Sequence, residues 1–344
     1  MGQSSCGCGC GQKTLTTIAP LTGPPRTLGT KIGWRDVLGG WKVRWGFGRA
    51  QYTVAPGLYR VGAPDSASPV LVTANYKLTV DAVRRSLVGL NVWLLVLDTK
   101  GVNVWCAAGK GTFGTEELVR RIQAANLREV VKHRELVVPQ LGATGVAAHE
   151  VKRAAGFSVH YGPVRARDLP AYLAAGMKAT PAMRRVTFGW KERLAVAPVE
   201  LVAAVGPLLA IAAFVAALDV LRHQRLTTYT LTGMVPFLAA VLTGGLVVPW
   251  LLPWLPFRAF TLKGAVAGAL VAAGLLWWLP VGAVEGAGAA LLVMAITSYM
   301  AMTFTGSTTF TTLAGVRVEV RRGLPPILIA AGAGAILRVA GAFI

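Results

Sequence analysis

The chain of 344 residues combines a hydrophobic composition with a strong positive charge. Hydrophobic residues make up 54% of it and charged residues only 15%, yet the formal net charge is +20. A disordered chain would be less hydrophobic, and a single soluble domain would carry about 25% charged residues, so both classes are excluded. Residues 1–198 hold 27 Lys and Arg against 11 Asp and Glu, whereas residues 199–344 hold 8 against 4. We therefore expect a basic, water-compatible half followed by an apolar half.

The N-terminal residues 1–12, MGQSSCGCGCGQ, lack the charged and apolar regions of a signal peptide. Cys6, Cys8 and Cys10 lie too close together for a disulfide framework and lack CxxC spacing. Their thiols suit a soft metal cation, so this tail is either a flexible metal trap or a chain with incidental cysteines. We expect residues 1–50 to form a flexible N-terminal segment.

From residue 51 to residue 178, short apolar strands alternate with helices. We predict strands at 69–73, 92–97, 136–138 and 158–161, and helices at 80–87, 115–125, 146–155 and 168–175. This alternation indicates an α/β fold with a doubly wound, Rossmann-like parallel sheet. Ligands of such sheets bind beyond the carboxyl ends of the strands. The candidate site therefore lies among residues 73–75, 98–110, 142–145 and 161–163.

A basic, aromatic connector at residues 179–198 precedes an all-α transmembrane domain over residues 199–344. Five apolar runs, at 199–218, 228–252, 262–281, 283–304 and 324–343, each approach the roughly 20 residues that span a bilayer. Reduced thiols and the positive-inside rule place the N-terminal half in the cytoplasm, although the loop with Arg222 and Arg225 does not fit the rule. We expect a multi-pass protein of the inner (cytoplasmic) membrane. Arg338, in the last span, either snorkels toward the C-terminus, which we favour, or lines an internal site.

The stretch with the most specific chemistry is GVNVWCAAGKGTFG at residues 101–114. It is not a phosphate-binding P-loop, because Lys110 is followed by Gly111 rather than Ser or Thr. A GxGxxG dinucleotide fingerprint is also absent. Cys106 paired with a histidine would make a nucleophile, but no pattern places His133, His149 or His160 beside it.

Residues 103–110, NVWCAAGK, resemble the cap-helix signature of the mercury-methylating corrinoid protein family, HgcA. That family is similar to the corrinoid domain of the corrinoid iron–sulfur protein of acetyl-CoA synthesis. The likeness extends to VTANYK at 72–77, LDTK at 97–100, GTFGTEE at 111–117, VPQLGA at 138–143 and GVAAHEV at 145–151, and to the five C-terminal spans.

The resemblance implies a cobalamin-type corrinoid over the carboxyl edge of the sheet. The Cys106 thiolate would be the lower axial ligand of cobalt and the catalytic residue, and a methyl group would pass from methyl-cobalt to Hg(II) to give methylmercury. Thr73, Asn75 and Thr99 would hydrogen-bond the corrin side-chain amides. The residues expected to form the cap helix and its close approaches to the cofactor are Asn103, Val104, Trp105, Ala107, Ala108, Gly109, Gly142 and Gly145. For the last two glycines, ordinary turn geometry is an equal explanation.

The resemblance also implies partners. The chain has no cysteine set for an iron–sulfur cluster, so a ferredoxin-like protein with two 4Fe-4S clusters would supply electrons. Hg(II) or a mercury–thiolate complex would be the substrate, a methyl donor or donor methyltransferase would supply the methyl group, and a lipid bilayer would hold the C-terminal half. No nucleic acid is expected. Two other functions stay open: a corrinoid methyl carrier for a different acceptor, as in the acetyl-CoA pathway, and a transporter or sensor with a ligand-binding domain.

Overall fold

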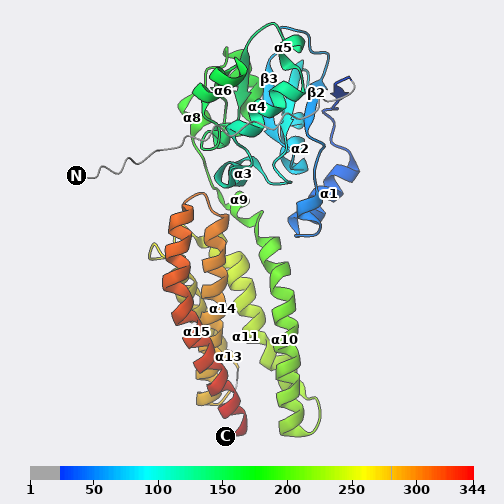
Figure 1. Ribbon diagram of the computed structural model, residues 1–344. Coiled ribbons are helices and arrows are strands. Elements are labelled where there is room, and N and C mark those ends of the chain that lie inside the picture. The colour runs from blue at the N-terminus through cyan, green and yellow to red at the C-terminus, as the bar shows by residue number, and fades with distance from the viewer. Residues whose placement is uncertain (1–23, 280) are drawn as a thin grey trace, which may run out of the picture. The chain divides into compact units, whose positions relative to one another are not determined.

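The computed structural model describes residues 24–279 and 281–344, which form two compact units (Figure 1). The first unit consists of Gly48–Arg185 with the described residues before Arg44, and the second of Val186–Ile344 with Arg44–Phe47. The three N-terminal cysteines, Cys6, Cys8 and Cys10, lie outside the described residues.

The first unit is built on a six-stranded mixed sheet with the order β1-β2-β4-β3-β5-β6. The strands are β1 Arg26–Thr27, β2 Gly57–Val61, β3 Val70–Ala74, β4 Val92–Leu97, β5 Glu135–Val138 and β6 Ser158–Tyr161. β4, β3, β5 and β6 pair in parallel, which confirms the predicted strands and their direction. β2 is antiparallel to β4, and β1 is parallel to β2. The sequence did not predict these two strands, because their Gly- and Pro-rich region has no clear apolar period.

Helices cover both faces of this sheet, as a doubly wound fold requires. They are α1 Trp34–Arg44, α2 Lys77–Ser86, α3 Val104–Lys110, α4 Thr115–Ala124, α5 Leu127–Val130, α6 Ala148–Ala155, α7 Leu169–Ala174 and α8 Pro181–Arg184, with short 3₁₀ turns η1 Arg49–Gln51, η2 Gln140–Gly142 and η3 Ala166–Asp168. One buried cluster joins α3, α4 and α6 to Val72 of β3. A second joins α2 and α7 to the neighbouring Leu71, because successive strand residues point to opposite faces.

A cluster of four charged residues attaches α1, which the sequence analysis did not predict, to α2. The Asp36 carboxylate of α1 accepts hydrogen bonds from Lys77 Nζ at 2.5 Å and Arg84 Nη2 at 2.6 Å, and both cations also contact Asp81. The hydrogen bond from the Lys77 ammonium, aided by that from Arg84, holds the pKa of Asp36 well below its usual range, although burial opposes the shift. Two carboxylates and two cations thus neutralise one another where the helices meet.

The second unit is helical. Its elements are α9 Trp190–Leu194, α10 Ala197–His223, α11 Thr228–Leu242, the π-helical turn η4 Thr243–Val247, α12 Val248–Leu251, α13 Phe260–Trp278, α14 Ala283–Phe304, the 3₁₀ turn η5 Thr305–Ser307 and α15 Leu313–Phe343. Over the described residues, five helical segments are long and apolar enough to cross a membrane. They confirm the five predicted spans and indicate a multi-pass membrane protein.

Glycines bring the backbones of neighbouring membrane helices close together. A Cβ on Gly264 of α13 would lie 2.6 Å from Ser298 Cα of α14, and one on Gly341 of α15 would lie 2.8 Å from Glu285 Cα of α14. Such approaches allow the dense packing that drives association between helices in a lipid environment.

The expectation that Arg338 snorkels toward the C-terminus is wrong. Arg338 is 4% exposed, and its Nη1 lies 3.0 Å from Glu285 Oε1 on α14. The close packing of α14 and α15 supplies a carboxylate inside the bundle, so the guanidinium pairs there instead of extending to water.

Replacing Asp36→Asn should loosen the attachment of α1 to the first unit. Removing a part-buried carboxylate that accepts charged hydrogen bonds should cost about 1–2 kcal/mol, discounted because Asp81 still pairs both cations. Hydrogen exchange of the α1 amides at pH 7 should therefore rise about tenfold relative to wild type. Because the pKa of Asp36 is depressed from 3.8, this attachment is intact at neutral pH and weakens only as the pH falls below that value.

The matched control is Asp65→Asn, which changes an exposed loop carboxylate that bonds Ser68. It should leave the exchange of α1 unchanged. Equal exchange of α1 in wild type and Asp36→Asn would contradict the role given to the cluster.

Candidate functional site

The four parallel strands end at one edge of the sheet. Asn75 follows β3, Asp98 follows β4, Pro139 follows β5 and Gly162 follows β6. The connections from β3 and from β4 run to opposite faces, because α2 packs on one face and α3 and α4 on the other. This edge is therefore the place at which an open α/β sheet binds ligands.

The side chain of Asn75 organises the connection between β4 and α3. Its Oδ1 accepts hydrogen bonds from Thr99 N at 3.2 Å, Thr99 Oγ1 at 2.8 Å and Gly101 N at 3.1 Å, and its Nδ2 donates to Asp98 Oδ1 at 3.2 Å. Asn75 is 4% exposed and Thr99 is fully buried. Both residues, expected to bind corrin amides, thus have partners within the chain.

The turn before α3 requires a glycine. Gly101 has a φ of +71°, and a Cβ there would lie 2.5 Å from the Ala50 carbonyl oxygen. Its amide is one of the donors to Asn75, so the tight turn and the hydrogen bonds fix the point at which the chain approaches α3.

The short helix α3 presents the Cys106 thiol away from the core. Asn103 caps the helix, with its Oδ1 accepting the Cys106 amide at 2.9 Å. Val104, Ala107 and Ala108 are buried, whereas Trp105 and Cys106 are half-buried. Cys106 is a free cysteine. Gly109 and Lys110 are exposed at the end of the helix, and a Cβ on Gly109 would meet nothing within 4 Å.

The inner side of α3 rests on the loop that follows β5. A Cβ on Gly145 would lie 2.1 Å from the Phe113 carbonyl oxygen and 3.1 Å from Ala108 Cα, and one on Gly142 would lie 2.5 Å from Phe113 Cε1. The absent side chains of Gly142 and Gly145, and the small ones of Ala107 and Ala108, are therefore explained by packing within the domain. Among the small residues that were expected to approach the cofactor, only Gly109 faces open space.

Thr73 lies apart from these residues. It belongs to β3, where it shares the sheet face of Leu71, whereas α3 packs on the face of Val72. Its Oγ1 is buried and has no hydrogen-bond partner, and the whole residue is inaccessible. The topology thus brings Asn75, Thr99 and the α3 residues together but leaves Thr73 on the other side of the sheet.

A buried carboxylate that the sequence analysis did not single out also supports this loop. Glu117 of α4 accepts the Asp98 amide at 2.9 Å and pairs with Arg120 and with Arg121 at 2.8 Å. Burial alone would raise the pKa of Asp98, but hydrogen bonds from the Lys100 side chain and amide hold it below its usual value. Asp98 is therefore ionised at neutral pH and paired with Lys100 beside the start of α3.

Two histidines of this unit have partners elsewhere, and His149 is exposed on α6. His133 bonds the Ser68 carbonyl, and His160 lies 3.5 Å from Glu135. Over residues 24–279 and 281–344, no group of three or more His, Cys, Asp or Glu side chains is arranged to hold a metal ion. Cys106 is thus left as the soft donor at the carboxyl edge.

Comparison with known proteins shows a similarity within this unit. Residues 48–173 match the model of the CO dehydrogenase/acetyl-CoA synthase delta subunit family, CdhD. The subunit gamma of the acetyl-CoA decarbonylase/synthase complex of Methanopyrus kandleri is 38% identical over 127 residues, which are 36% of this chain and 27% of that protein. The corresponding subunit of Archaeoglobus fulgidus is 33% identical over the same shares of each chain.

The similarity is confined to the first unit. The gamma subunit of Methanocaldococcus jannaschii is 37% identical over 98 residues, which are 28% of this chain and 20% of that protein. The chain thus spans about a quarter of the length of the curated relatives it matches. Residues 48–173 are thus similar to the CdhD family and to the gamma subunit, and the membrane helices lie outside the region that the family model matches.

Replacing Asn75→Ala should disorder the segment that leads into α3. The change leaves the Thr99 and Gly101 amides without their acceptor in a buried place, and each unsatisfied donor costs about 1–3 kcal/mol, whereas the Thr99 hydroxyl keeps the Val102 carbonyl as acceptor. Hydrogen exchange should increase at least tenfold in residues 98–106 and much less in β3.

Asn91→Ala is the matched control, because Asn91 also accepts a backbone amide, that of Ala63, but at an exposed position. It should change exchange only around Ala63. If Asn75→Ala behaved like this control, the amide would not organise the approach to α3.

Proposed function

We propose that this protein is a membrane-anchored, corrinoid-dependent methyltransferase that methylates Hg(II). The observation that carries the proposal is the free Cys106 thiol, half-buried on the outward side of a helix at the carboxyl edge of a doubly wound sheet. A small, well-supported helix with one soft donor is suited to holding a soft or borderline metal inside a macrocycle through an axial thiolate.

The residues present fit a cobalamin-type corrinoid. The donor chemistry is right, since a thiolate is a strong ligand and a metal-bound thiol is deprotonated outright. The outward side of α3 also has room, because a Cβ on Gly109 or Gly111 would meet nothing within 4 Å. Cys106, Trp105 and Gly109 are the residues of the motif that would face the group, with Asn103 and Val104 holding the helix.

A bound corrinoid supplies the cobalt centre that carries the methyl group. The chain's own contribution would be the thiolate of Cys106, which would hold the metal, and ligand identity is a main control on the reactivity of a macrocyclic metal. Asn103 fixes the Cys106 backbone through its amide, while Asn75 and Glu117 hold the preceding loop. These contacts position the sulfur before the cofactor binds, so little ordering remains when it does.

The observations point to two different acceptors of the methyl group. Hg(II) is favoured by the resemblance of residues 103–110 to the HgcA cap helix. A different acceptor, in a reaction like that of the acetyl-CoA pathway, is favoured by the relatives, which are subunits of acetyl-CoA decarbonylase/synthase complexes. The match to the family model ends at residue 173, and the five apolar helices lie beyond it. We therefore rank Hg(II) above the other acceptor.

The proposal includes several partners. A ferredoxin-like protein with two 4Fe-4S clusters would return electrons to cobalt, because among the described residues no cysteine group can hold a cluster. A methyl donor or donor methyltransferase would supply the methyl group. The N-terminal half, with its large excess of Lys and Arg, would attract an acidic partner or an anionic mercury–thiolate complex on the cytoplasmic side of the inner membrane.

Replacing Cys106→Ala should abolish methyl transfer to Hg(II), because it removes the axial sulfur. The full-length protein, purified with cobalamin, should lose the Cys106-dependent shift in its optical and EPR spectra. Membrane insertion should be unchanged, since Cys106 is half-buried and the buried side of α3 is not altered.

Three results would separate the alternatives. A spectrum that does not respond to the substitution would contradict axial ligation, and full activity of the variant would contradict the mechanism. An intact spectral response with methyl transfer to a thiol or carbonyl-branch acceptor, but none to Hg(II), would favour the acetyl-CoA-pathway-like carrier.

Replacing Cys6, Cys8 and Cys10 together by Ser should reduce mercury methylation only in part. These thiols would raise the local concentration of a soft cation without holding the methyl-carrying metal. Initial rates at limiting and saturating Hg(II) test this, with a decrease expected only at limiting Hg(II). Complete loss at both concentrations would make the tail an essential carrier of mercury.

A further inference from the structure

A polar cavity opens among α10, α11, α13, α14 and α15 in the membrane unit. Its volume is about 490 Å³, within the range of small-molecule sites, and its wall combines charged, hydroxyl and apolar side chains. The cavity lies at the end of the bundle where α10 passes into α11 and α13 into α14, whereas α10 begins at the other end (Figure 1).

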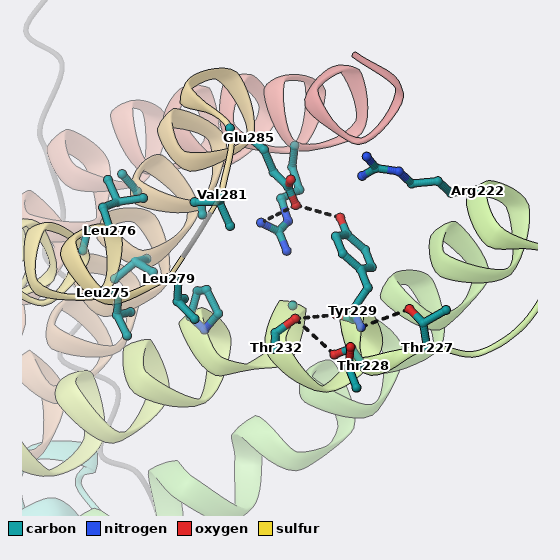
Figure 2. Close-up of a pocket in the computed structure, with 18 of the residues that line it drawn as sticks. Arg222, Thr227, Thr228, Tyr229, Thr232, Leu275, Leu276, Leu279, Val281 and Glu285 are labelled. Carbon is teal, nitrogen blue, oxygen red and sulfur yellow. Dashed lines mark hydrogen bonds and ion pairs between the residues drawn. The ribbon is translucent and has the colours of Figure 1, made fainter.

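Three side chains from three helices form the polar centre of the cavity. Glu285 Oε1 accepts a hydrogen bond from Tyr229 Oη at 2.8 Å and lies 3.0 Å from Arg338 Nη1. Figure 2 shows the Tyr229 hydroxyl directed at Glu285, with Thr228 and Thr232 on the same helix as Tyr229. Ionisable groups inside a membrane domain are costly, and they are retained mainly where they line a functional cavity.

The positive charge at this centre exceeds the negative charge. Arg338 Cζ lies 5.7 Å from the centroid of the Tyr229 ring and Arg222 Cζ lies 5.9 Å from it, so two guanidinium groups accompany the single carboxylate of Glu285. The carboxylate of Asp219 does not line the cavity: it is fully buried behind the wall, where it is bonded to His223, Thr227 and Thr230. Among the described carboxylates, none forms an ion pair with Arg222.

The packing of the helices leaves the Arg338 guanidinium accessible to a ligand. A Cβ on Gly233 of α11 would lie 3.1 Å from Arg338 Nη2, so the missing side chain makes room for the guanidinium at the cavity wall. A guanidinium has five N–H donors, and the contact with Glu285 uses only one of its nitrogen atoms. Donors held at a buried wall favour a ligand that accepts hydrogen bonds and carries negative charge.

The opposite wall of the cavity is apolar. Leu275, Leu276, Leu279 and Val281 line the side formed by the end of α13 and the following loop (Figure 2). The cavity therefore presents cations and hydroxyls to one end of a ligand and aliphatic carbon to the other.

We propose that this cavity binds one amphipathic anion, with a phosphate or carboxylate head between Arg222 and Arg338 and an alkyl chain against the α13 wall. The head group would accept the free guanidinium donors and replace water beside Tyr229. The ligand is either an anionic lipid of the bilayer leaflet at this end of the bundle or a soluble amphiphile of the same chemistry. This proposal is independent of the corrinoid function.

Native mass spectrometry of the full-length protein in detergent tests the proposal, with phosphatidylglycerol, phosphatidylcholine and decyl phosphate as separate probes. Wild type should retain one phosphatidylglycerol at least tenfold more tightly than phosphatidylcholine. Arg222→Gln should weaken this binding about tenfold, or 1.4 kcal/mol at 25 °C, because it removes a cation at the exposed rim. Arg225→Gln, a matched loss of charge in the same loop but outside the cavity wall, should have no effect.

Glu285→Gln tests whether removing negative charge from the cavity strengthens binding of the anion. The amide keeps an acceptor for the Tyr229 hydroxyl but removes the only carboxylate at the centre, so binding of the anion should become tighter. Unchanged or weaker binding by a monodisperse Glu285→Gln protein would overturn the proposal.

The probes distinguish the two sources of ligand. Phosphatidylglycerol binding that depends on Arg222 supports a bilayer lipid, and decyl phosphate binding that depends on Arg222 without lipid selectivity supports a soluble amphiphile. Equal effects of Arg222→Gln and Arg225→Gln, or no preference for either anion over phosphatidylcholine, would show that the cavity is not an anion site.

Discussion

The amide side chain of Asn75 is the constraint on which the arrangement of the candidate site depends. It lies at the end of β3 and accepts hydrogen bonds from Thr99 and Gly101, which follow β4. One buried carbonyl oxygen thus ties the ends of two neighbouring strands together and sets the direction in which the chain enters α3. The position of the Cys106 sulfur follows from that direction, from the Asn103 cap, and from the glycine-lined loop under the helix.

Much of the fold of the first unit is predictable because its parallel strands are continuous apolar runs. The run VWLLVL predicted β4 with its observed bounds, since a strand covered on both faces needs no polar alternation. β2 was missed because its sequence, GLYRV, lies in a Gly- and Pro-rich region and reaches the sheet by a non-local antiparallel pairing with β4. The attachment of α1 was missed for a similar reason, since Asp36 meets Lys77 across 41 positions.

The sequence predicted the location of the candidate site better than the roles of its individual residues. Successive side chains of β3 point to opposite faces of the sheet, so Thr73 and Val72 lie on different faces. Applying this alternation to the sequence would have placed Thr73 away from α3. The roles of Gly142 and Gly145 required the fold itself, because their close contacts are with Phe113 and Ala108, about 30 positions earlier in the chain. Sequence singles out Cys106 as the proposed donor, but the contacts that position it are distributed over β3, α4 and the loop after β5.

The membrane unit uses buried charge in a different way. Glu285 and Arg338 come from α14 and α15, and the glycines between these helices bring the two backbones close enough for the pair to form. Desolvating two ions costs several kcal/mol each, so an apolar pair of similar volume would hold the helices together at least as well. Stability alone therefore does not account for the pair. With Tyr229 and the second cation, Arg222, it instead gives one end of the bundle a positive, hydrogen-bonding cavity. The electrostatics of this cavity thus favour an anionic ligand over a bare metal cation beside Arg338.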